Sequence, residues 1–106
     1  MRVILFIFLQ IFSLIANAAS TNTQLIKRVQ YNAASGQLFF VGEGDWLIPG
    51  CENAIYALFK PELEGVQEAL SIGLAAYLAG KKVTFWGDCN PSGPEYFFAS
   101  YIIIRD

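Results

Sequence analysis

The sequence predicts a small, mainly β domain with one helix, in the order strand, strand, strand, helix, strand, strand. Five short segments are rich in β-branched and aromatic residues and are separated by glycine, proline or asparagine. A single longer segment carries apolar residues at spacings of three and four, which is the period of a helix with one buried side. This segment lies between the third and the fourth predicted strand, which defines the order of elements.

The first two strands are expected to form a hairpin. Residues 25–31 (LIKRVQY) and 37–41 (QLFFV) alternate apolar and polar side chains or combine aromatic and β-branched ones. The residues between them, 32–36 (NAASG), are typical of a turn, in which Gly36 can adopt a positive φ. A turn of this length between two strands predicts that they pair in antiparallel fashion.

Three further strands are predicted at residues 53–60 (NAIYALFK), 83–86 (VTFW) and 96–104 (YFFASYIII). Between the second and third strands, residues 42–51 (GEGDWLIPGC) contain three glycines and a proline, which indicates a loop. Residues 87–94 (GDCNPSGP) have the composition of a turn. Strict alternation along the last strand predicts one shared face for the following side chains: Tyr96, Phe98, Ser100, Ile102 and Ile104.

The helix is predicted to begin after Pro61 and to end at Gly80. Proline and acidic residues suit the first turn of a helix, and a glycine followed by two lysines suits its end. Five apolar residues form a stripe that should face the core: Leu63, Val66, Leu70, Leu74 and Leu78. Gly73, beside this stripe, lowers the helix propensity and is interpreted as a point of close packing.

Five strands with one helix between the third and fourth form the order of the OB-fold barrel. We therefore predict an α+β domain built on a five-stranded OB-fold-like barrel, in the order β-β-β-α-β-β. The alternative is an open antiparallel sheet with one helix packed on it.

The first eighteen residues have the three parts of a secretory signal peptide. Arg2 is followed by a mostly apolar segment, 3–16, and then by small residues that favour cleavage after Ala18 or Ala19. The apolar segment is short for a membrane span, which needs about twenty residues. We thus predict a signal peptide at 1–18 and a single small domain at 19–106, either secreted or periplasmic. The polar residues 19–24 are expected to be frayed.

The predicted domain is acidic, which bears on its partners. Without Arg2 it has six basic and nine acidic residues, or a net charge of −3. A nucleic-acid partner usually requires a basic face, and an anionic membrane surface requires a polybasic patch. Neither pattern is present in the sequence, so we expect no nucleic-acid partner. The chain turns polar beyond Ala16, so we also expect no membrane span once the signal peptide is removed.

The two cysteines, Cys51 and Cys89, are predicted to form a disulfide. Small exported domains commonly depend on disulfides, and two cysteines allow only one intramolecular pairing. The bond would close a loop of 38 residues and contribute about 4 kcal/mol by the loop-entropy model. The alternatives are a reactive thiol or a zinc site, which would need carboxylates to complete it because the chain has no histidine.

The composition argues against catalysis. A chain without histidine has no imidazole base or metal ligand, and paired cysteines leave no thiolate nucleophile. Glu43, Asp45 and Glu52 are near one another in sequence and could form an acid/base pair for glycoside chemistry, but a solvated acidic loop is the preferred interpretation. Asp88 and Glu95 form a similar, weaker candidate pair. We predict no catalytic residues, no metal site and no cofactor.

Trp46 is the candidate ligand-binding residue, together with Glu43 and Asp45. A tryptophan in a glycine-rich loop beside carboxylates suits stacking on a sugar ring, and aromatic side chains are also frequent in protein interfaces. The alternative is that Trp46 folds back over one end of the barrel as a lid. Trp86, which lies within a predicted strand, is expected to pack in the core or at the sheet edge.

Residues 69–89 (ALSIGLAAYLAGKKVTFWGDC) resemble a group of small secreted bacterial proteins. These proteins have a signal peptide, one disulfide and no established activity. Their layout is similar to that of the OB-fold binding subunits of bacterial AB5 toxins. The resemblance extends over roughly residues 25–106 and implies an OB-fold and secretion. No glycan-contacting motif of the toxin subunits matches this sequence position by position, so the resemblance implies no binding residue.

These observations predict a secreted or periplasmic, non-catalytic binding module for a glycan or a protein ligand, which could form a homo-oligomer. The alternative is a small secreted structural or inhibitor-like protein that inserts the 42–50 loop into a partner. A hydrolase based on carboxylates is a third, less favoured hypothesis.

Overall fold

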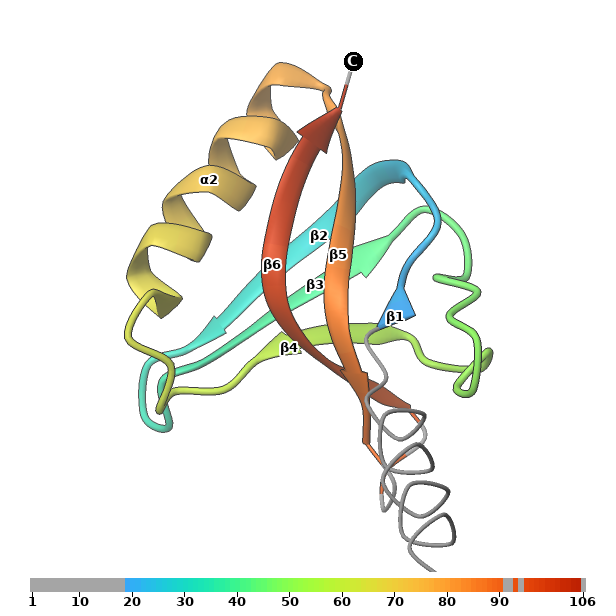
Figure 1. The fold of residues 1–106 in the computed structure, drawn as a ribbon. Helices are drawn as coiled ribbons and strands as arrows, with labels where there is room; N and C mark the ends of the chain where they lie inside the picture. Colours follow the sequence, from blue (N-terminus) through green and yellow to red (C-terminus); the bar gives the residue numbers. More distant parts are fainter. Residues whose placement is uncertain (1–18, 91–92, 94, 106) are drawn as a thin grey trace, which may run out of the picture.

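The computed structural model describes residues 19–90, 93 and 95–105 of the chain. The predicted signal peptide, 1–18, lies outside the described residues. The domain is mainly β with one helix, as predicted (Figure 1). The elements are β1 (Ala19–Ser20), β2 (Gln24–Asn32), β3 (Gln37–Gly42), β4 (Tyr56–Phe59), α2 (Val66–Ala79), β5 (Lys82–Cys89) and β6 (Tyr96–Arg105). The predicted order is confirmed, with β1 as an additional short strand.

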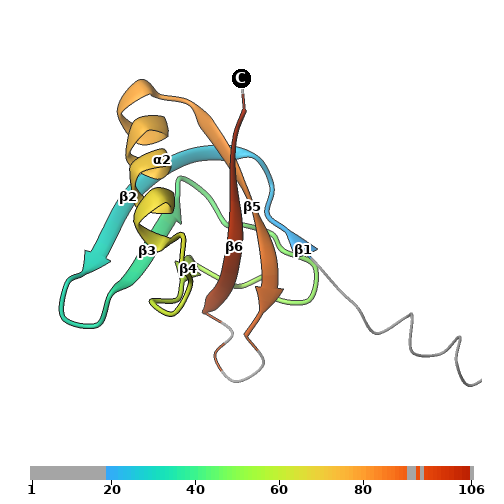
Figure 2. The ribbon, with the colours of Figure 1, turned by 60° about the vertical axis from the view of Figure 1, so that its left-hand side comes forward.

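The strands form one sheet whose pairings return on themselves. β2 pairs with β3 and β3 with β4 in antiparallel fashion, β4 pairs with β6 in parallel, and β6 pairs with β5 in antiparallel fashion. β5 then pairs with β2 through two residue pairs, Gln24 with Val83 and Leu25 with Lys82. Five strands thereby enclose the core, while β1 extends the edge of β5 beyond β2 (Figure 2).

The N-terminal residues 19–24 are ordered, and the prediction that they are frayed is wrong. Ser20 pairs with Trp86 of β5, and the backbone amide of Thr21 donates to the carbonyl of Phe85 at 2.9 Å. The Thr21 hydroxyl is buried, where it accepts a hydrogen bond from the Phe85 amide at 3.0 Å. Polar composition concealed this role because the segment supplies backbone hydrogen bonds to β5 rather than apolar side chains.

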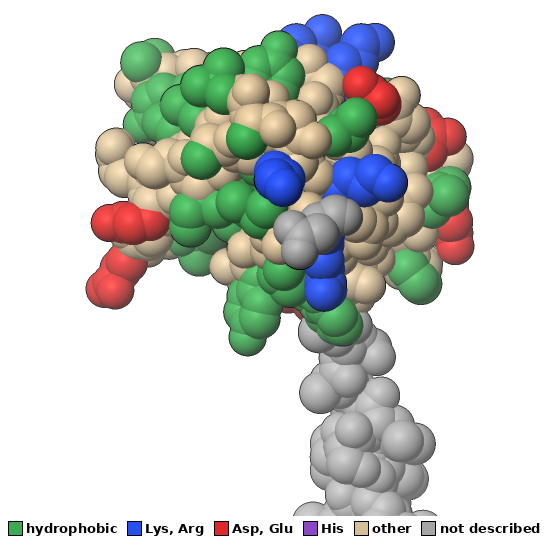
Figure 3. Space-filling view, turned by 90° about the horizontal axis from the view of Figure 1, so that it is seen from above, with side chains coloured by type: hydrophobic (Ala, Val, Ile, Leu, Met, Phe, Trp, Pro, Cys, Tyr) green, Lys and Arg blue, Asp and Glu red, His purple; other side chains and the backbone are tan. Residues whose placement is uncertain are grey.

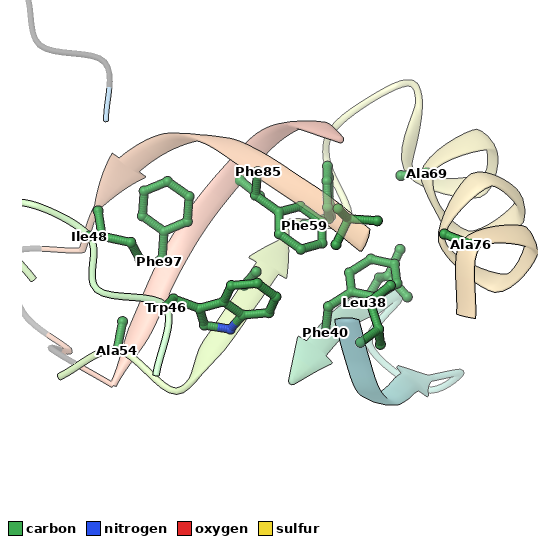
Figure 4. Close-up of a cluster of buried hydrophobic side chains, with 14 of the residues drawn as sticks. Leu38, Phe40, Trp46, Ile48, Ala54, Phe59, Ala69, Ala76, Phe85 and Phe97 are labelled. Atoms are coloured by element: carbon green, nitrogen blue, oxygen red, sulfur yellow. The ribbon is translucent and has the colours of Figure 1, made fainter. Parts of the chain in front are cut away.

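The core is a row of aromatic side chains inside the curved sheet (Figure 4). Phe85 lies at its centre, with its ring 5.2 Å from the rings of Phe40 and Trp46 and 5.9 Å from that of Phe59. One end of the row meets α2, and the other end is covered by the loop that carries Trp46 and Ile48. The helix and the loop thus close opposite ends of the same core.

The helix faces the core with small side chains, which corrects the predicted leucine stripe. Its buried residues are Val66, Ala69, Gly73 and Ala76. A side chain at Gly73 would overlap the ring of Phe40, so only a residue without a Cβ lets α2 approach the sheet this closely. Leu74 and Leu78 of the predicted stripe are exposed, because the side of the helix that can approach closely is the side with small residues.

A β-bulge in β6 corrects the predicted alternation of its side chains. Trp86 and Gly87 are consecutive in β5, but their partners are Tyr101 and Ala99, so Ser100 is an extra residue in β6. Before the bulge, the buried side chains are Phe97 and Ala99. After the bulge, Ile102 pairs with the buried Phe85 and shares its side of the sheet. Ile102 and Ile104 therefore do not continue the face of Tyr96 and Phe98.

The predicted disulfide between Cys51 and Cys89 is present. It connects the end of β5 to the loop that follows Trp46, across a sequence separation of 38 residues. β5 is longer than predicted and includes Cys89, because Gly87 and Asp88 continue the pairing with β6 beyond the bulge.

Candidate functional site

Trp46, the predicted ligand-binding residue, belongs to the core. Its side chain has an exposed fraction of 0%, and its ring meets that of Phe85 edge-on. The indole N–H donates to the carbonyl of Ile55 at 3.0 Å, which satisfies its one polar atom. The prediction that Trp46 stacks on a ligand is therefore replaced by the alternative arrangement, in which Trp46 folds back and covers one end of the sheet.

The acidic side chains around Trp46 point to solvent. Glu43, Asp45 and Glu52 are all exposed, and the Glu52 carboxylate accepts a hydrogen bond from the Gly50 amide at 3.3 Å. Gln24 holds the loop from the other side, where its side-chain oxygen accepts from the Gly44 amide at 2.6 Å. Within the described residues, no group of three cysteine or acidic side chains is arranged to hold a metal ion.

Because Trp46 is buried, its ring face is not available beside the exposed Glu43 and Asp45. The three residues predicted as a ligand-binding set are thus separated into a core side chain and two solvated carboxylates.

The exposed aromatic pair lies elsewhere, on the outer face of β5 and β6. Trp86 and Tyr101 are direct cross-strand partners, with exposed fractions of 37% and 63%. Trp86 points outward because it follows the buried Phe85 in β5, and successive side chains of a strand point to opposite faces. Ser20 of β1 pairs with Trp86 on its other side, so three strands support this surface.

A hollow of about 500 Å³ adjoins the pair and is lined by Trp86, Gly87, Asp88, Ser100 and Tyr101. The bulge shapes it, since the extra residue of β6 is Ser100 itself. The Ser100 hydroxyl donates to the carbonyl of Trp86 at 3.4 Å, and a side chain at Gly87 would overlap the backbone of Phe98 and Ala99. The close contact between the strands therefore sets the backbone positions from which the two aromatic side chains extend.

The groups on this surface are of kinds that can contact a ligand. Two aromatic rings offer apolar area at a low cost in conformational entropy, and the Asp88 carboxylate and the Ser100 hydroxyl lie in the same hollow. Asp88 is exposed and accepts hydrogen bonds when ionised. Glu95, its predicted companion, is exposed and does not line this hollow.

Tyr101 was not among the predicted site residues, and Trp86 was predicted to lie in the core or at the sheet edge. The signal available for Trp86 was its place next to Phe85, because only one of two consecutive strand residues can face the core. Tyr101 carried no such signal. Regular alternation along β6 would put Tyr101 on the inner face, opposite to Ser100. The bulge at Ser100 instead brings Tyr101 to the outer face beside Trp86, and this bulge has no signature in the sequence.

A second aromatic group, on the outer face of β3, β4 and β6, is engaged in its own packing. The rings of Tyr56 and Tyr96 are stacked at 5.3 Å, and Phe39 meets Tyr56 edge-on at 5.6 Å. All three side chains are partly buried. Since their ring faces cover one another, they offer a ligand less free aromatic surface than Trp86 and Tyr101.

The chain matches no protein-family model, and neither the curated proteins nor the solved structures include a significant match to it. In the part of the chain that the structure describes, no helix has the length and apolar character needed to span a membrane.

Proposed function

We propose that this chain is an exported, non-catalytic binding module with an OB-fold barrel, and that the outer face of β5 and β6 binds a glycan. The observation that carries the proposal is the exposed pair of Trp86 and Tyr101 beside a hollow that contains a carboxylate and a hydroxyl.

The OB-fold assignment is supported by the strand pairings. Five strands pair in a ring, β4 and β6 pair in parallel, and the helix lies between β4 and β5 in the chain. The helix also covers one end of the core, where it meets Phe40 through Gly73. In OB-folds the face of the second and third strands often carries the ligand. Here that face is β3 and β4, and its aromatic rings pack on one another, which favours β5 and β6 instead.

Glycan binding is supported by the kinds of group that the site combines. The faces of pyranose rings are apolar and pack on aromatic side chains, while sugar hydroxyls hydrogen-bond to carboxylates and hydroxyls. Export is supported by the signal-like residues 1–18 and by the disulfide, which is stable outside a reducing cytoplasm. The absence of histidine from the sequence and the pairing of both cysteines support a role without catalysis.

The proposal is tested by screening the oxidised protein against a panel of glycans. The affinity for the glycan that binds most tightly is then measured for the wild type and for variants of the protein. Trp86→Ala and Tyr101→Ala should each weaken binding about tenfold or more, because a central aromatic contact contributes on the order of 1.4 kcal/mol or above. Tyr31→Ala is the matched control, since Tyr31 is also an exposed aromatic residue but belongs to β2. It should leave binding unchanged.

Two results would count against this proposal. Binding that survives the double change Trp86→Ala and Tyr101→Ala would move the site elsewhere. The second result is that the chain binds no glycan, but that another protein covers Trp86 and Tyr101 when it binds. In that case the surface would still be the binding site, and its ligand would be a protein instead of a glycan.

A second function, inhibitor-like insertion of the 42–50 loop into a partner, is favoured by Leu47. This leucine is 58% exposed and has a φ of +52°, while its neighbours Trp46 and Ile48 are fully buried. The buried neighbours hold an apolar side chain in an exposed, fixed position. Leu47→Glu should abolish binding of a protein partner through this loop and leave glycan binding at Trp86 intact.

A further inference from the structure

The outer side of α2 carries more apolar surface than an isolated domain requires. Only four of its residues are buried, and large apolar side chains remain exposed along the helix and just before it: Leu63, Ile72, Leu74, Tyr77 and Leu78. Leu78 has an exposed fraction of 80%. A surface helix normally presents charged and polar residues to solvent. Leu74, Tyr77 and Leu78 are three and four residues apart and share one side of α2, where they form an exposed apolar patch of the kind that marks interaction sites. Ile72 lies on the other flank and lines a hollow with Glu68 and with Ile102 of β6.

Charges lie at the two ends of this apolar side and are absent from its middle. Glu64 and Glu68 lie at the start of α2, and Lys81 and Lys82 follow its end at Gly80. The residues from 69 to 80 include no charged side chain. Figure 3 shows hydrophobic side chains gathered over the side of the molecule where α2 lies, with acidic side chains at the outer edge and basic ones toward the centre.

This pattern is complementary to itself when two helices lie antiparallel. A two-fold axis across the middle of α2 would bring Glu64 and Glu68 of each copy to Lys81 and Lys82 of the other, at both ends of the contact. A parallel arrangement would bring like charges together instead. Leu74 and Leu78 are four residues apart and exposed, and they continue the row of Leu70, which packs on the core of its own domain. Such a row suits packing against the same row of a second helix.

We propose that a second copy of this chain covers α2, so that the protein forms a two-fold symmetric dimer through antiparallel α2 helices. A helix of 14 residues is about 21 Å long, so the contact is small compared with the roughly 1,600 Å² of a standard interface. The dimer should therefore dissociate on dilution. This surface is separate from the Trp86–Tyr101 face, and the inference does not depend on what that face binds.

The first test is sedimentation equilibrium of the full chain, expressed for export and recovered oxidised, over a wide concentration range. The wild-type protein should shift from monomer to dimer as concentration rises. Leu74→Glu with Leu78→Glu should remain monomeric, because each contact surface would gain buried like charges. Leu47→Glu removes an exposed leucine far from α2 in sequence and should dimerise as the wild type does.

The second test separates pairing by charge from general apolar association. A variant with Glu64→Lys and Glu68→Lys, and another with Lys81→Glu and Lys82→Glu, should each dimerise at least tenfold more weakly than the wild type. An equimolar mixture of the two should form heterodimers, because every end contact then joins lysine to glutamate. A wild-type protein that stays monomeric, a dimeric Leu74→Glu/Leu78→Glu variant, or a mixture without heterodimers would each overturn the proposal.

Discussion

At the scale of single residues, Trp46 changes from a predicted ligand contact to the largest fully buried side chain among the described residues. We predict that Trp46→Ala lowers the free energy of unfolding by about 3–5 kcal/mol, because it leaves a large cavity and removes the hydrogen bond to Ile55. Trp86→Ala, the exposed counterpart, should cost about 1 kcal/mol or less. Guanidinium unfolding of both variants measures the difference. Equal effects of the two changes would contradict the burial of Trp46.

For Gly73 we predict that replacement by alanine changes the stability in the direction opposite to the usual one. Replacing glycine by alanine within a helix normally stabilises it by about 1 kcal/mol. Gly73→Ala should instead destabilise the domain, because the new methyl group would overlap the ring of Phe40. Gly65→Ala, at the N-cap of α2, is the steric control, since a Cβ there meets no atom within 4 Å. It should cost about 1 kcal/mol or less, because alanine is a poorer N-cap than glycine. Thermal unfolding measures both changes, and a stabilised Gly73→Ala protein would mean that α2 is farther from the sheet.

At the scale of elements, the sequence predicted which segments are strands and helix better than which side of each faces the core. The hairpin, the helix and the cysteine pair could be predicted because turn residues, periodicity and cysteine count are local or compositional signals. The side of α2 that faces the core could not, because leucines outweigh alanines and glycine in any apolar pattern. The decisive fact was instead the steric contact between Gly73 and Phe40.

The candidate site also depends on a contact between elements that no local sequence signal predicts. Trp86 was identifiable as an outward residue, but its partner Tyr101 is set by the extra residue at Ser100. A bulge depends on how two strands pair over their whole length, and a single sequence contains no local mark of it. The predicted site at Trp46 was wrong for a related reason. A glycine-rich loop suggests exposure, whereas this loop closes the open end of a sheet and must supply apolar side chains to the core.

At the scale of the whole molecule, α2 and the Trp46 loop cover opposite ends of the core and are held in place by different interactions. The α2 end is held by packing of small residues on Phe40, while the loop end is connected to β5 by the disulfide. The crosslink encloses β4, α2 and β5, so it limits the unfolded chain across more than a third of the sequence. Because a domain of this size has a total stability of roughly 5–15 kcal/mol, the disulfide is a large part of it.

We therefore predict that the double change Cys51→Ala and Cys89→Ala lowers the free energy of unfolding by about 4 kcal/mol, the loop-entropy value for 38 residues. Urea unfolding of the variant and of the oxidised wild type measures this difference. Reduced wild-type protein is the control, since it keeps every side-chain atom of Cys51, which is buried. Agreement between the reduced protein and the variant assigns the loss to the crosslink. A reduced protein as stable as the oxidised one would show that packing alone holds the Trp46 loop over the core.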